Sequence, residues 1–204
     1  MRYLKRVIMA AVAATTIFVM GATVDAAIVA GDSRNTVVLT GDIQYGDAAQ
    51  MNKELGNLDR IHTGQYGLHL YINSTGGMGA EIMTIIGVID RFQKGIGGLV
   101  YTYNYGFAFS AGALLFLRGD IRIMHETATV MFHDAYFMGQ NGLKVPKNDP
   151  AVPAWAWKRL EYMNKWSRAY IKKRCKLSDS LIDAEKFMQA DEAVKYNVCT
   201  KIIK

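Results

Sequence analysis

Residues 68–77 read LHLYINSTGG and are the most informative part of the chain. The apolar residues Leu68, Leu70 and Ile72 alternate with His, Tyr and Asn, which is the period-two pattern of a β-strand with one buried face. Apolar residues then recur at helical spacing as far as Phe92. This pattern predicts a strand, a glycine-rich turn and an amphipathic helix.

The rest of the chain repeats this order of elements. A second strand, turn and small-residue helix are predicted over residues 99–103, 104–109 and 110–117. All three prolines fall within residues 141–153, which we interpret as a loop. Other strands are predicted at 36–40, 121–124, 127–132 and 198–202, and other helices at 47–55, 154–174 and 191–196. Strands that alternate with helices indicate an α/β fold with mostly parallel pairing.

The composition excludes several classes of protein. The chain has 204 residues, of which 50% are hydrophobic, and two cysteines, too few for a disulfide scaffold. The sequence contains neither a C-x-x-C nor an H-E-x-x-H motif, so we expect no metal and no other cofactor. A net charge of +6 is too small to indicate nucleic acid as a partner. Whether Cys175 and Cys199 pair is left open.

The first 26 residues have the features of an export signal. Arg2, Lys5 and Arg6 precede a run of uncharged residues from 7 to 24, and small residues at Val24 and Ala26 would suit cleavage after Ala26. The alternative is an uncleaved membrane anchor. We therefore expect residues 27–204 to form one domain that is exported, either periplasmic or secreted, with membrane contact only through an uncleaved N-terminal segment.

Two predicted helix starts carry candidate catalytic groups. Gly77 and Ala111 lie where unpaired backbone N–H groups are available, and two such turns side by side would bind an oxyanion. Ser110 precedes the second helix, either as a nucleophile or simply as a helix cap. His133 follows a buried strand, where ligand sites of α/β sheets collect, and is a candidate general base.

Four motifs in this order resemble the Clp protease proteolytic subunit, within the wider Clp-peptidase and crotonase fold. They are LHLYINSTGG (68–77), GFAFSAGA (106–113), ATVMFH (128–133) and EKFMQADEAVKYNVCTKI (185–202). The resemblance covers residues 36–202. It implies a fold of repeated ββα units with a long C-terminal helix.

The resemblance also implies a serine peptidase. By position, Ser110 matches the nucleophile, His133 the general base, and the N–H groups of Gly77 and Ala111 the oxyanion hole. The third member of the family's triad is an aspartate, and the matching residue here is Glu185. Its side chain is one methylene longer, and we keep Asp183 as a reserve.

Other positions depart from the family pattern. Thr75 replaces the proline of the usual S-P-G-G turn. The proline-rich residues 145–153 fall in the region that resembles the handle, which joins the rings of the family's assembly. We expect a homo-oligomer in which Trp155, Trp157 or Trp166 contributes to a subunit interface.

The sequence therefore favours a serine peptidase that cleaves peptides or unfolded segments through an acyl-enzyme. Because an exported protein meets no ATP, we expect it to work without an ATP-driven unfoldase. Two alternatives remain open: a catalytically degenerate binding or assembly protein of the same fold, and a crotonase-like acyl-transfer enzyme. The presence of Ser110 and His133 speaks against both.

Overall fold

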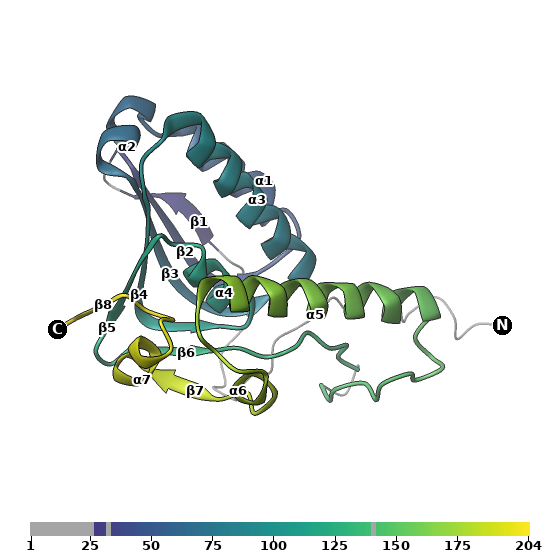
Figure 1. Cartoon of the computed structure of the whole chain (residues 1–204). Coiled ribbons are helices and arrows are strands. Elements are labelled where there is room, and N and C mark those ends of the chain that lie inside the picture. Colours follow the sequence, from purple (N-terminus) through teal and green to yellow (C-terminus); the bar gives the residue numbers. More distant parts are fainter. Residues whose placement is uncertain (1–26, 32–33, 140–141) are drawn as a thin grey trace.

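The computed structural model of this chain describes residues 27–31, 34–139 and 142–204. These residues place helices against a central sheet, from which one long helix extends (Figure 1). The expected signal peptide or anchor, residues 1–26, lies outside the described residues. Within the described ranges, no helix is long and apolar enough to cross a membrane.

The sheet is mostly parallel, as the alternating strand and helix patterns predict. The described strands are β1 (Ala27–Ala30), β2 (Thr36–Ile43), β3 (Leu68–Gly77), β4 (Val100–Phe109), β5 (Ile121–His125), β6 (Thr129–Met131), β7 (Phe187–Gln189) and β8 (Lys201–Ile203). Along the path β1-β2-β3-β4-β5-β8, each neighbouring pair is parallel except β1 and β2. The first half of β4 pairs with β5 and its second half with β6, so the sheet divides at β4.

Two segments that the sequence predicts as turns belong to strands. Residues 74–77 and 104–109 continue β3 and β4, because Ser74 still pairs with Ala108 after an irregularity in the register. The two glycines that end β3 have φ angles of 111° and 132°, a region open mainly to glycine. The glycines therefore bend a strand that keeps its partners.

Helices α1 (Asp47–Asn57) and α3 (Gly79–Ile96) pack beside one another against the sheet (Figure 1). The apolar positions of α3 are buried, which confirms the helical spacing in the sequence: Ile82, Ile85, Ile86, Ile89 and Phe92. A short helix, α2 (Arg60–Tyr66), was not predicted. It begins where the Asp59 carboxylate accepts a hydrogen bond from the His62 N–H group.

The C-terminal part begins with α5 (Ala154–Arg174), which extends away from the sheet (Figure 1). It is followed by α6 (Asp179–Asp183) and α7 (Ala190–Lys195). Asn197, shortly after α7, has a φ of 56°, the left-handed conformation in which many helices end. Cys175 and Cys199 are both buried, and neither forms a disulfide in the described structure.

Candidate active site

The backbone at Ser110 is strained. Ser110 lies between β4 and α4 (Ala111–Leu117), with φ of 54° and ψ of −120°. In a residue other than glycine such a conformation costs about 1–3 kcal/mol, and strain of this kind collects at functional sites. Within the described part of the chain, the Ser110 side chain makes no capping hydrogen bond to α4. The helix-cap interpretation therefore does not account for this serine.

The end of β3 and the segment around Ser110 pack closely because glycines lie at their contact points. A Cβ atom added to Gly76 would lie 2.6 Å from the Cβ atom of Ser110. A Cβ atom added to Gly112 would lie 2.9 Å from the carbonyl oxygen of Ser74. Both distances are far below ordinary contact, so glycine at these two places lets the end of β3 touch the Ser110 turn.

Thr75 stands where the resembling family has proline. Its hydroxyl group donates a hydrogen bond to the Asp42 carboxylate at the end of β2. Proline would restrict this turn through its ring. Here a side-chain contact with the neighbouring strand ties the turn in place.

His133 lies beside Ser110 because β6 pairs with the end of β4. The Ser110 N–H group donates to the carbonyl oxygen of Met131 at 2.9 Å, two residues before His133. Ser110 and His133 line one cavity together with Gly77 and Ala111. The structure thus brings four of the five predicted site residues to one place.

The remaining wall of this cavity is mostly apolar. Ile82 and Met83 of α3, Leu114 of α4 and Met163 of α5 line it. Asn164 and Ser167 of α5 add polar groups. The cavity therefore combines an apolar wall with the few polar groups near Ser110 and His133.

The hydrogen bonds of His133 assign its tautomer. Its Nδ1 atom lies 2.6 Å from the carbonyl oxygen of Asp134, which can only accept a hydrogen bond. A neutral His133 therefore carries its proton on Nδ1, leaving Nε2 as an acceptor. Nε2 is buried and has no hydrogen-bond partner among the described residues.

Burial is the main influence on the charge of His133, which is 8% exposed. Burial lowers the pKa of His133 because the imidazolium ion loses hydration. The hydrogen bond with Asp134 and the negative charge of Glu185 act in the opposite direction, and the Lys144 charge lowers the pKa further. The net shift is downward, so His133 is neutral near pH 7.

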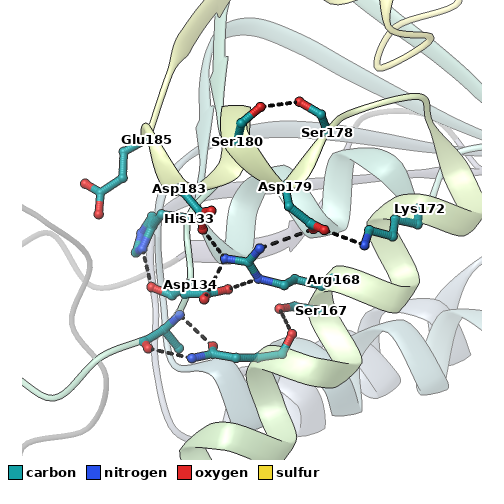
Figure 2. Close-up of polar contacts among 12 residues, drawn as sticks. His133, Asp134, Ser167, Arg168, Lys172, Ser178, Asp179, Ser180, Asp183 and Glu185 are labelled. Carbon is teal, nitrogen blue, oxygen red and sulfur yellow. Dashed lines mark hydrogen bonds and ion pairs between the residues drawn. The ribbon is translucent and has the colours of Figure 1, made fainter. Parts of the chain in front are cut away.

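The two predicted acids contact cations. Glu185 forms an ion pair with Lys144, and Asp183 forms one with Arg168. Neither carboxylate is hydrogen-bonded to His133 in the described structure. Figure 2 shows Glu185 near the His133 ring, and it acts on the ring through its charge.

The sequence analysis missed the residues that surround His133. Asn164 and Arg168 contact the segment after His133, and Lys144 reaches Glu185 from a distant loop. The spacing of Asn164 and Arg168, four residues apart on a predicted helix, places them on one face but does not reveal what they contact. No group of His, Cys, Asp and Glu residues in the described ranges could hold a metal ion.

We compared the sequence with models of known protein families. The Clp protease family matches residues 20–204. The chain belongs to the Clp protease family. No curated protein matches the chain. Membership of this family confirms the α/β Clp-peptidase fold expected from the four motifs. The members of the family are serine peptidases. Clp proteases typically bind peptide substrates and assemble into oligomeric rings.

Proposed function

We propose that this chain hydrolyses peptides and unfolded protein segments through an acyl-enzyme, with Ser110 as nucleophile and His133 as general base. The Ser110 Oγ atom attacks the peptide carbonyl carbon while its proton passes to Nε2 of His133. His133 then returns this proton to the leaving amine as the C–N bond breaks. Water, deprotonated by the same nitrogen, hydrolyses the ester and restores Ser110.

The observation that carries the proposal is the unpartnered Nε2 of His133 in the cavity that Ser110 lines. A buried polar atom without a partner costs free energy, about 1–3 kcal/mol. An unpartnered Nε2 is expected if this atom is the one that receives a proton during the reaction. The strained turn at Ser110, whose hydroxyl group does not cap α4, supports the same proposal.

Gly77 and Ala111 are proposed to stabilise the tetrahedral oxyanion. Ala111 is the first residue of α4, where N–H groups have no partner within the helix. Gly77 lies at the end of β3 and lines the same cavity. Two N–H donors directed at one oxygen would lower the activation free energy by several kcal/mol, because a single such donor is worth about 3 kcal/mol.

Glu185 is proposed as the acid of the site. Its negative charge favours the imidazolium ion that forms when His133 accepts the Ser110 proton. The ion pair with Lys144 offsets part of this charge. Asp183 is the weaker candidate, because its carboxylate is bound by Arg168 and the charges that act on the His133 ring include Glu185 but not Asp183.

The pH dependence of the activity tests these charges. His133 must be neutral to act as a base, so kcat/KM is lost as the pH falls through its pKa, which burial places below the ordinary value of about 6.5. Glu185→Gln removes a charge that raises this pKa, and the midpoint should move to lower pH. Lys144→Gln removes a charge that lowers it, and the midpoint should move to higher pH.

Lys147→Gln, on the same loop as Lys144, serves as the control and should leave the midpoint unchanged. The measurement is kcat/KM for one peptide substrate over the range in which His133 titrates. Shifts in the same direction for Glu185→Gln and Lys144→Gln would contradict the proposed roles.

Export and independence from an unfoldase belong to the proposal. They rest on the apolar segment 7–24 and the positive residues before it. A peptidase outside the cytoplasm would have no ATP and would cut short peptides or chains that are already unfolded. Hydrolysis of a quenched peptide library without nucleotide tests this independence from an unfoldase, which a requirement for ATP and an ATPase would contradict. Acyl-CoA substrates offered in parallel test the crotonase-like alternative.

We also expect the chain to self-associate. Clp proteases form rings, and Trp155 and Tyr162 of α5 are 62% and 63% exposed in the isolated chain. Large exposed aromatic residues are enriched in subunit interfaces. Light scattering at micromolar concentration should give a multiple of the monomer mass, and Trp155→Ser should reduce it. A monomer mass for the unaltered chain would contradict the expectation.

A further inference from the structure

His133 needs support from outside the sheet. Residues 132–137, all of which the structure describes, form no helix or strand. The far end of this segment is held by the backbone, because the Phe137 carbonyl oxygen accepts a hydrogen bond from the Val145 N–H group at 2.8 Å. Nearer to His133, two side chains of α5 contact the segment. Asn164 and Arg168 lie about one helical turn apart on α5, and both contact this segment. Figure 2 shows Arg168 directed at Asp134.

Asn164 replaces a missing strand partner. Its side-chain oxygen accepts a hydrogen bond from the Ala135 N–H group at 2.8 Å, and its side-chain nitrogen donates to the Ala135 carbonyl oxygen at 3.0 Å. Both backbone groups of Ala135 are therefore satisfied by one amide. This double contact fixes the main chain two residues after His133.

Arg168 binds Asp134, the residue between His133 and Ala135. Its Nε and Nη2 atoms donate to the two carboxylate oxygens of Asp134, each at 2.8 Å, which is the bidentate geometry that arginine favours. Arg168 also forms ion pairs with Asp179 and Asp183 of α6. The bidentate contact with Asp134 does not depend on these pairs, because it uses both carboxylate oxygens of Asp134 directly.

Arg168 thus holds the Asp134 carboxylate, and Asn164 holds the N–H group of the peptide bond that follows Asp134. The carbonyl oxygen of that same peptide bond accepts the Nδ1–H hydrogen bond of His133. We propose that Asn164 and Arg168 are positioning residues, which fix the tautomer of His133 by keeping the Asp134 carbonyl oxygen within hydrogen-bond distance of Nδ1. This inference rests on the proposed role of His133 as the general base. The backbone carbonyl orients the ring, and Glu185 supplies charge.

A different role for Arg168 must be separated from this one. Arg168 also joins α5 to α6 through Asp179, which Lys172 contacts as well. Asp179→Asn and Lys172→Gln weaken that junction and leave the Asp134 contact in place. They are the matched controls for Arg168→Gln and Asp134→Asn.

The experiment uses the full chain and two measurements. Nitrogen NMR shifts of the His133 ring report its tautomer, and steady-state kinetics separates kcat from KM. The unaltered protein should carry its proton on Nδ1. Arg168→Gln and Asp134→Asn should each give a mixture of tautomers and lower kcat by about 10- to 100-fold with KM little changed, which is the cost of a misplaced catalytic group.

Charge alone would give a different result. Arg168→Gln and Asp134→Asn remove opposite charges, so a purely electrostatic role would shift the pKa of His133 in opposite directions without changing the tautomer. Glu185, Lys144 and Asp134 are the charged groups that act on the ring, and all but Asp134 are unaltered in the two variants. The double variant should be no worse than the worse single variant, because both break one contact.

Several results would overturn the proposal: a proton on Nε2 in the unaltered protein, unchanged tautomers and kcat in both variants, opposite pKa shifts alone, or equal damage from Asp179→Asn. The tautomer is also measured in Ser110→Ala protein, where no turnover is needed. An inactive chain with the expected tautomers would overturn the proposed function and leave the positioning role standing.

Discussion

Ser110→Ala should lower peptide hydrolysis on the order of 10³-fold or more and leave the fold intact. The reason is that Ser110 supplies the attacking oxygen, whereas its side chain makes no capping hydrogen bond to α4 in the described structure. Losing the hydroxyl group therefore removes the acyl-enzyme without removing a helix cap. Turnover of a quenched peptide and circular dichroism check the two halves of this expectation.

Ser178→Ala is the matched control. Ser178 is an exposed serine that also precedes a helix, and it contacts the hydroxyl group of Ser180. It should retain full activity. Unchanged hydrolysis in pure Ser110→Ala protein would sink the assignment of the nucleophile.

Gly77→Ala should strongly reduce both the stability and the activity of the protein. An added Cβ atom would lie 2.1 Å from the carbonyl oxygen of Ile43, and the φ of 132° is strained for any other residue. Because the obstacle is the backbone of β2, the strand itself must move, and we expect a loss of about 3 kcal/mol or more in the free energy of unfolding. Chemical denaturation measures this loss, and hydrolysis should fall with it, since Gly77 is one of the two proposed oxyanion donors.

Gly87→Ala provides a control in α3. No described atom outside its own helix lies within 4 Å of an added Cβ atom there. Alanine is favoured over glycine inside a helix by about 0.5–1 kcal/mol, so this variant should be slightly stabilised and fully active. Equal stability of Gly77→Ala and Gly87→Ala would contradict the tight contact between β2 and β3.

Much of the fold follows from local patterns in the sequence. The alternation of Leu68, Leu70 and Ile72 predicts β3 because one face of that strand is buried, and α3 follows from its apolar spacing. At the ends of β3 and β4 the sequence predicts turns, because glycine and polar residues favour them, whereas the structure has strands there. Pairing with a neighbouring strand overrides that tendency here. β7 has three residues, too few to show an alternation.

The candidate site divides in the same way. Ser110, His133, Gly77 and Ala111 could be chosen as candidates because they lie at the ends of predictable strands and turns, where parallel topology brings groups together. The contact between the Asp134 carbonyl and Nδ1 was not predictable, since any residue provides a carbonyl oxygen. The pairing of Lys144 with Glu185 joins residues 41 positions apart. It depends on a loop whose path no local pattern specifies.

The central claim is that Ser110 is a nucleophile activated by His133, and one measurement tests it most directly. The full chain is treated with a fluorophosphonate, which reacts with activated serines, and the modified residue is located by mass spectrometry of its peptides. We predict a single adduct on Ser110, which forms faster as the pH rises through the pKa of His133 and is lost in His133→Gln. An unlabelled protein, or an adduct on another residue while Ser110 stays free, would contradict the account.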